Sequence, residues 1–102
     1  MQPNEFAVAD LPPGSISLVI VDDEDVAVYN CGGDIYATTN ACPHAEGPLN
    51  EGKLKGCIVT CPWHGSQFDV RDGSVVHGPA DEPVATYKVT ISDGIGRVEA
   101  KE

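Results

Sequence analysis

Short segments rich in Val, Ile, Thr and Tyr recur along the chain, separated by Gly, Pro, Asn and Asp. The β-branched and aromatic residues favour strands, the separating residues favour turns, and the apolar spacing of a helix is almost absent. The pattern therefore predicts an all-β sandwich or small barrel. The expected strands span residues 15–21, 26–29, 35–38, 55–60, 66–70, 74–76, 85–91 and 96–100.

Several connections between these strands carry residues that accept a positive φ. Gly-Gly at 32–33 and Asp-Gly at 72–73 and 93–94 can each supply the backbone conformation that a short hairpin requires. The acidic run at 22–25 is expected at another hairpin tip. These signals predict antiparallel pairing of neighbouring strands.

Three stretches do not fit strands, namely residues 40–52, 61–65 and 77–83. Loops held by a rigid scaffold often carry function. The first two of these stretches contain closely spaced Cys and His residues. We therefore expect the chemistry of the protein to lie in them.

The length of 102 residues suits one domain, which would bury roughly 60 to 70% of the surface of the unfolded chain. The sequence contains no internal repeat, low-complexity tract or linker-like change of composition. A single domain covering residues 1–102 is the expectation.

Sixteen acidic residues face only six Lys and Arg, so the net charge is -10. Such a charge repels nucleic acid and anionic membranes and favours partners with basic patches. No apolar run reaches 18 residues, and the N-terminus lacks the basic start of a signal peptide. We expect a soluble, cytoplasmic monomer that binds neither nucleic acid nor membrane.

Two loops each offer one thiolate and one imidazole: Cys42 with His44, and Cys61 with His64. Without a secretion signal, a metal or redox role is a better default for cysteines than disulfides. Sixteen residues separate His44 from Cys61, and the strand expected at 55–60 can return the chain within that gap. The four side chains are therefore expected to converge on one site.

The sequences Cys42-Pro43-His44 and Cys61-Pro62-Trp63-His64-Gly65 resemble the paired signature of Rieske proteins. The resemblance implies a Rieske-type antiparallel β-sandwich or barrel with a cluster-binding subdomain at about residues 40–80. It also implies one 2Fe-2S cluster, with Cys42 and Cys61 on the inner iron and His44 and His64 on the outer iron. The segment His77-Gly78-Pro79-Ala80 is similar to the proline-containing loop that covers the cluster in this family.

Segments 11–14 and 48–52 look like those of the small ferredoxins that serve bacterial aromatic ring-hydroxylating dioxygenases. This narrower resemblance implies a one-electron carrier that takes electrons from a flavin-containing NAD(P)H reductase and delivers them to a terminal oxygenase. Docking is expected through the loop residues Pro43, Glu46, Trp63 and Pro79. The chain offers no second iron site of the 2-His-1-carboxylate kind, so no catalysis of its own is expected.

Two alternatives stay open. The chain could be a Rieske subunit of another oxidoreductase, such as a nitrite reductase small subunit. More remotely, the same four residues could hold zinc in a binding module, although Cys42 and His44 are closely spaced for two ligands on one metal.

The reduction potential should be low for this family. Neutral histidines make the oxidised centre uncharged, which raises Rieske potentials to roughly -150 to +300 mV. High-potential members carry a disulfide where this chain has Gly47 and Trp63, and a tyrosine hydroxyl where it has Phe68. Ser66 keeps the family's serine hydroxyl and should raise the potential modestly if it reaches a sulfur.

The remaining candidates are expected to have structural roles. Cys31 and Cys57 are predicted to be free thiols, with a mutual disulfide as the lesser alternative. His77 is predicted to lie at the surface or brace a loop. Trp63 is predicted to shield the cluster or contact a partner.

Overall fold

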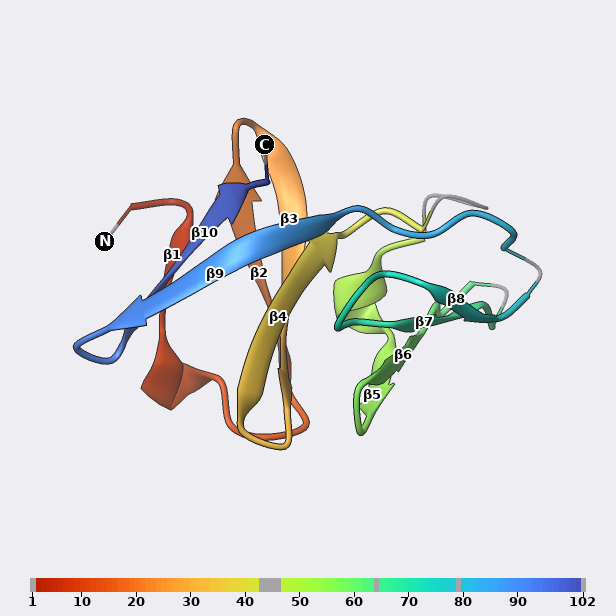
Figure 1. Cartoon of the computed structure of the whole chain (residues 1–102), viewed down its shortest axis with the longest axis horizontal. Helices are drawn as coiled ribbons and strands as arrows, with labels where there is room; N and C mark the ends of the chain where they lie inside the picture. The colour runs from red at the N-terminus through yellow and green to blue at the C-terminus, as the bar shows by residue number, and fades with distance from the viewer. Residues whose placement is uncertain (1, 43–46, 64, 79, 102) are drawn as a thin grey trace.

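The computed structural model describes residues 2–42, 47–63, 65–78 and 80–101, and the strands within them form two antiparallel sheets. The six-stranded sheet has the order β1-β10-β9-β4-β3-β2, and the four-stranded sheet has the order β5-β6-β7-β8. Figure 1 shows the two sheets side by side along the long axis of the molecule. The predicted all-β fold is confirmed. The strands are β1 Glu5–Ala7, β2 Ile16–Val21, β3 Glu24–Cys31, β4 Asp34–Thr39, β5 Lys53–Lys55, β6 Ile58–Thr60, β7 Gln67–Asp69, β8 Val75–His77, β9 Thr86–Ser92 and β10 Ile95–Ala100.

The six-stranded sheet curls into a nearly closed barrel. Its two edges approach each other at the start of the chain, where the Ile20 N–H on β2 donates to the Pro3 carbonyl just before β1 (3.0 Å). We call this sheet the barrel and the four-stranded sheet the small sheet. Two short 3-10 helices, Val8–Asp10 and Leu49–Glu51, complete the regular structure. No helix in the described part of the chain is long and apolar enough to span a membrane.

The barrel hairpins are made by the turns that the sequence predicts. Asp22 and Asp23 both have positive φ values, 50° and 67°, so the acidic run does lie at the tip of the β2–β3 hairpin. Asp93 and Gly94 likewise have φ values of 51° and 78° between β9 and β10. Two consecutive residues in this region give a turn whose twist matches that of the flanking strands.

Two predictions about strands need correction. The strand expected at 55–60 is broken at Gly56, which has a φ of 62°, and the chain folds back so that β5 pairs with β6. The three-residue strand β1 was not predicted, because its hydrophobic signal consists largely of one buried side chain, Phe6. Its ring packs over Gly96 on β10, where there is no room for a side chain.

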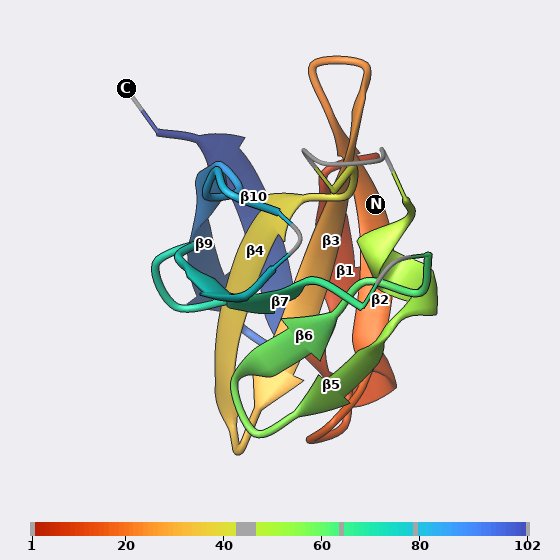
Figure 2. The same ribbon diagram turned by 90° about the vertical axis from the view of Figure 1, so that its right-hand side faces the viewer.

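Strand β3 is buried on both faces and separates two apolar cores. Val26 and Val28 face the barrel interior, where they pack with residues such as Leu11 and Val98. The alternate residues Ala27, Tyr29 and Cys31 face the small sheet. On that side they pack with Leu49, Val59, Phe68, Val70, Ala80 and Val84. Figure 2 shows the small sheet lying across this outer face of the barrel.

The small sheet arises from a single excursion of the chain out of the barrel. Strand β4 ends at Thr39 and strand β9 begins at Thr86, yet the two strands pair directly, with Thr38 opposite Thr86. The Thr39 N–H donates to the Ala85 carbonyl (2.9 Å). The chain therefore leaves and re-enters the barrel at almost the same point.

A disulfide joins Cys31 to Cys57, so the prediction that these are free thiols is wrong. Cys31 ends β3, and Cys57 lies in the β5–β6 turn. The packing of the small sheet on β3 brings their Cα atoms to 5.0 Å, within the range that a disulfide spans. The two residues are 26 positions apart in the sequence, which gives no sign of this proximity.

Candidate metal centre

Cys42 lies just beyond β4 at the start of the first loop and is almost fully buried. Its backbone N–H donates to the Gly47 carbonyl (3.0 Å), so Cys42 and Gly47 lie close together. The predicted ligand His44 falls in that loop, outside the described residues. The thiol of Cys42 thus points into the apolar core on the outer side of β3.

Cys61 lies directly after β6 and repeats this arrangement. Its N–H donates to the Ser66 carbonyl (2.8 Å), and its own carbonyl accepts from the Gly65 N–H (3.2 Å). In both loops the cysteine N–H therefore reaches a carbonyl five residues further on. Gly65 has a φ of 77°, as this tight return requires. The predicted ligand His64 lies outside the described residues.

The two loops contact each other at Gly47. A side-chain carbon on Gly47 would lie 2.9 Å from the Cys61 sulfur and 3.1 Å from Cγ of Trp63. Cys42 and Cys61 also belong to the same buried cluster, and neither takes part in the disulfide. The structure thus brings together the cysteine half of the predicted ligand set.

The segment after β8, which we call the third loop, packs on the second cysteine loop through Ser66. The Ser66 side chain is fully buried, and its Oγ accepts a hydrogen bond from the Ala80 N–H (3.0 Å). Because the oxygen accepts here, its own proton is left to donate elsewhere. His77 is exposed at the end of β8, as predicted, and Pro79 lies outside the described residues. The sequence pattern gave no sign of the Ser66–Ala80 contact, which joins segments 14 residues apart.

Aromatic side chains near the cysteines differ in polarity. Phe68 is fully buried and brings no hydroxyl. Tyr29 is also buried in this cluster, and its hydroxyl pairs with Thr38 Oγ1 (2.7 Å). Burial raises the pKa of Tyr29 well above its ordinary value, so this phenol stays neutral. Trp63 is different, since 58% of its surface is exposed beside the two loops.

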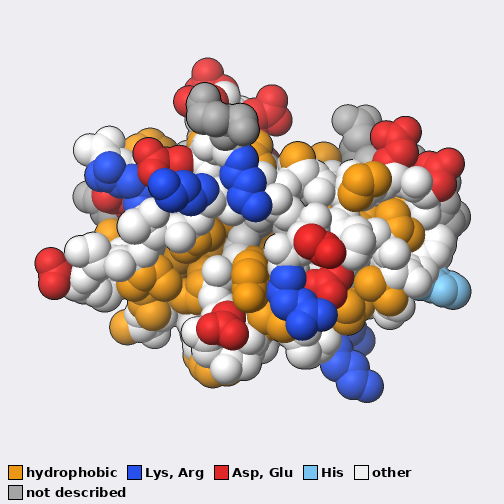
Figure 3. All heavy atoms as spheres, viewed as in Figure 1, with side chains coloured by type: hydrophobic (Ala, Val, Ile, Leu, Met, Phe, Trp, Pro, Cys, Tyr) orange, Lys and Arg blue, Asp and Glu red, His pale blue; other side chains and the backbone are white. Residues whose placement is uncertain are grey.

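Two acidic residues lie close to the cysteine loops in sequence and space. Asp81 and Glu82, directly after Ala80, are exposed in the third loop. Figure 3 shows carboxylates gathered at the end of the molecule that carries the small sheet. Of the four predicted docking residues, Trp63 is described and exposed, whereas Pro43, Glu46 and Pro79 lie outside the described residues.

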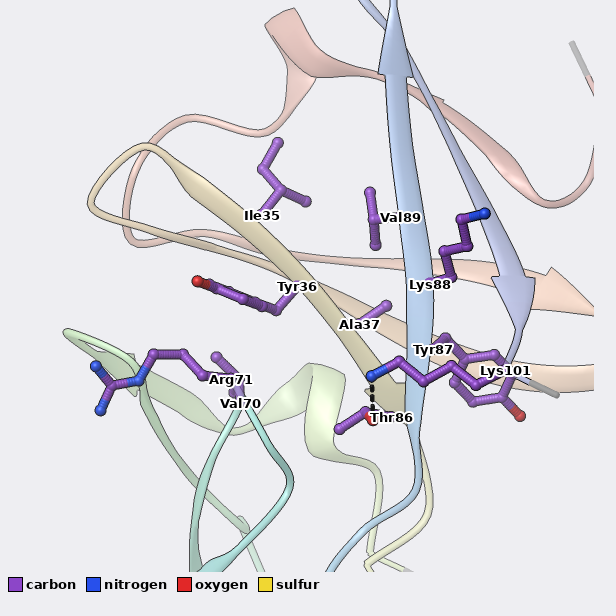
Figure 4. A pocket seen from close by; sticks show the side chains of 10 residues that line it. All are labelled: Ile35, Tyr36, Ala37, Val70, Arg71, Thr86, Tyr87, Lys88, Val89 and Lys101. Carbon is purple, nitrogen blue, oxygen red and sulfur yellow. Dashed lines mark hydrogen bonds between the residues drawn. The ribbon is translucent and has the colours of Figure 1, made fainter.

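A cavity of about 250 Å³ lies away from the cysteines, where β4 and β9 meet the segment after β7 (Figure 4). Two of its cations are engaged: Lys101 donates to Thr86 Oγ1 (2.9 Å), and Arg71 pairs with Asp69 (2.7 Å). None of the side chains drawn in Figure 4 is a cysteine or a histidine. The cavity therefore offers no soft metal ligands, unlike the paired cysteine loops.

The chain resembles known proteins over most of its length. The family model described as the Rieske [2Fe-2S] domain matches residues 4–88. The ferredoxin component of the naphthalene 1,2-dioxygenase system of Pseudomonas putida is 34% identical over 87 residues, which cover 85% of this chain and 84% of that protein.

Solved structures show the same likeness. The ferredoxin of carbazole 1,9a-dioxygenase from Nocardioides aromaticivorans IC177 superimposes with a TM-score of 0.91 and 32% identity, covering 96% of each chain. A chain from the complex of reduced oxygenase and oxidized ferredoxin in carbazole 1,9a-dioxygenase gives a TM-score of 0.86 and 35% identity, covering 90% of this chain and 95% of that chain. These coverages are too large for the likeness to be confined to the barrel.

Proposed function

Because this chain belongs to the Rieske 2Fe-2S family, we propose that it is the ferredoxin of a multicomponent aromatic-ring dioxygenase, carrying single electrons to the terminal oxygenase. The observation that carries the proposal is full-length similarity to proteins named as ferredoxin components. A ferredoxin of this kind has been solved together with its oxygenase. The chain thus acts as an electron carrier and has no catalysis of its own. A flavin-containing NAD(P)H reductase supplies the electrons.

The proposed ligands are Cys42 and Cys61 on one iron and His44 and His64 on the other. A bound 2Fe-2S cluster supplies the one-electron change of oxidation state. The cysteines suit it, because both are buried, begin equivalent turns and lie on loops in contact. The apolar neighbours Leu49, Val59 and Phe68 keep water from the two sulfurs.

We expect the centre to have a low potential within the Rieske range. Gly47 and Trp63 are in contact, so the site of the extra disulfide of high-potential relatives holds an indole ring and a glycine instead. Phe68 has no hydroxyl to donate to a sulfur. Ser66 has one, and its proton is not used in the bond to Ala80. A hydroxyl that donates to a cluster sulfur stabilises the reduced state and raises the potential.

Docking is proposed around Trp63, Asp81 and Glu82, which are exposed beside the loops. Redox partners that must separate quickly use small contact areas. With a net charge of -10, the chain should associate faster with basic partner surfaces at low ionic strength. A reductase reaction rate that is the same at low and high salt would argue against electrostatic docking.

The location and oligomeric state of the carrier belong to the same proposal. We propose that it works as a cytoplasmic monomer bound to neither membrane nor nucleic acid. Membership of an iron–sulfur family disfavours the zinc-stabilised module. The nitrite reductase alternative is less well supported than the dioxygenase role, because the relatives named above belong to dioxygenase systems.

Reconstitution tests the proposal. Purified reductase and oxygenase components of an aromatic dioxygenase should turn over only when this protein is added. Replacing either proposed imidazole ligand, as in His44→Ala or His64→Ala, should abolish that stimulation and the Rieske absorption spectrum. His77→Ala removes the remaining histidine, at an exposed position, and should leave both unchanged. A fully active His64→Ala protein would refute the ligand assignment.

A further inference from the structure

A disulfide adds a cross-link between the small sheet and the barrel. Among the described residues, no hydrogen bond joins a strand of the barrel to a strand of the small sheet. The connection consists of apolar packing against β3, the two chain crossings near residues 40 and 85 with hydrogen bonds such as Val84 N–H to the Gly73 carbonyl (2.9 Å), and the Cys31–Cys57 disulfide. The disulfide therefore joins a barrel strand directly to the β5–β6 turn of the small sheet, as backbone hydrogen bonds join neighbouring strands elsewhere in the fold.

The bond lies where it can restrain the cysteine loops. The loop that it closes, residues 31–57, contains β4, Cys42 and β5. On the other side, the Cys57 carbonyl accepts from the Val70 N–H (2.9 Å) just beyond β7. The restraint at Cys57 thus reaches both the first cysteine loop and the far side of the small sheet.

The two cysteines differ in exposure. Cys31 is buried, with 5% of its surface exposed, against the Tyr29 side of β3. Cys57 is partly exposed and follows Gly56, whose surroundings are open. An external thiolate would therefore reach the sulfur of Cys57 first, and Cys31 would be the leaving group.

We propose that Cys31–Cys57 is a thiol–disulfide exchange site for dithiol reductants, and that opening it loosens the small sheet that carries the cysteine loops. A reductant thiolate attacks the Cys57 sulfur, a mixed disulfide forms, and Cys31 leaves as a thiolate that takes up a proton. The second thiol of the reductant then attacks its own bound sulfur and releases Cys57. Two electrons and two protons pass to the protein, and the dithiol becomes a disulfide.

Opening the bond should affect the two sheets unequally. The barrel keeps its hydrogen-bonded ladders, whereas the small sheet keeps its own short ladders, its apolar contacts and the few hydrogen bonds at the chain crossings. Backbone amides on β6 should then exchange with solvent faster, while those of β9 and β10 should not. If the chain holds the proposed cluster, its iron should also be released faster, because one restraint on the Cys42 loop is gone.

Hydrogen–deuterium exchange of the whole protein before and after treatment with dithiothreitol tests this directly. We expect exchange in residues 53–60 to rise by about a hundredfold or more, the order expected when a cross-link that closes a loop of this size is removed. A mass increase of two hydrogens and alkylation of Cys31 and Cys57 by iodoacetamide, only after reduction, should accompany it. This readout needs neither partner protein nor cluster, so it can fail while the proposed function stands.

A matched control separates opening of the disulfide from attack of the dithiol on iron. The variant Cys31→Ala/Cys57→Ala should release iron to a chelator at the rate of the reduced wild type, with or without dithiothreitol. Alkylation of both cysteines without reductant would overturn the proposal, as would equal exchange of the small sheet before and after reduction. The comparison within the wild type stands even if the double variant does not fold.

Discussion

The barrel and the small sheet differ in how they are held together. In the small sheet every strand pairs with its neighbour in sequence, whereas the barrel combines tight hairpins with two long-range pairings, β1 with β10 and β4 with β9. The contacts that position the cysteine loops are not strand pairings but the bonds from Ser66 to Ala80 and from Cys31 to Cys57. The barrel therefore closes through backbone ladders, whereas the cysteine loops depend on a few side-chain contacts that exist only once the small sheet packs on the barrel.

The largest expected effect is loss of the metal centre on the small sheet while the barrel stays folded. Cys61→Ser removes one proposed iron ligand from a fully buried position. The protein should lose its iron and visible absorption almost entirely, because three ligands hold the cluster poorly. Amide protection in β9 and β10 should persist. Iron analysis and hydrogen exchange check this, and simultaneous loss of protection in the barrel would show that the two regions are not separable.

The second prediction concerns a substitution in the barrel core that should leave the metal centre unchanged. Leu11→Ala empties a buried site in the barrel core and should lower the free energy of unfolding by about 2–5 kcal/mol. Its matched control is Leu18→Ala on β2, where the side chain is 42% exposed and the cost should be below about 1 kcal/mol. Denaturant titration measures both. The reduction potential should be unchanged in each variant, and a shift with Leu11→Ala would mean that the barrel core tunes the centre.

A third prediction concerns the contact between the second and third loops. Ser66→Ala leaves the Ala80 N–H without its buried acceptor, at a cost of about 1–3 kcal/mol. It also removes a hydroxyl donor, so the potential should fall. Protein-film voltammetry should place the wild type below about +100 mV and the variant lower still. Ser92→Ala, at an exposed position on β9, should change neither quantity.

The smallest expected effect is a pH dependence at the surface of the small sheet. Hydrogen bonds from the Arg71 guanidinium hold the pKa of Asp69 below its ordinary value of 3.8. The carboxylate therefore stabilises the fold above that ordinary value, and the contribution disappears as the pH falls through the lowered folded value. Asp69→Asn should be slightly less stable than the wild type at neutral pH and equally stable in strong acid. Urea titrations at both pH values check this, and a difference that grows in acid would contradict it.

Sequence reasoning succeeded where structure is local. Alternating apolar residues and positive-φ turns predicted the barrel hairpins, because each is determined by a few adjacent residues. It missed the break at Gly56, since a continuous β-prone stretch hides a single turn residue. The disulfide was missed because only the packing of one sheet on the other brings Cys31 to Cys57.

The candidate site likewise contains residues that the sequence identified and residues that it did not. The spacing of the Cys–His pairs identified Cys42 and Cys61, which the structure does bring together. The roles of His44 and His64 stay predictions carried by the motif. The exposed Asp81 and Glu82 were not singled out, because their position beside the site depends on the Ala80–Ser66 bond.

The return of the chain to its starting point has a practical consequence. Because Thr39 and Ala85 are hydrogen-bonded to each other, residues 40–85 form a cassette with adjacent ends. We expect that such a cassette can be exchanged between related ferredoxins without altering the strand order of the recipient. The face of β3 that includes Cys31 would be the surface to match in any such chimera. Reduction potential and partner choice could then be transferred together to another protein, while the barrel of the recipient stays unchanged.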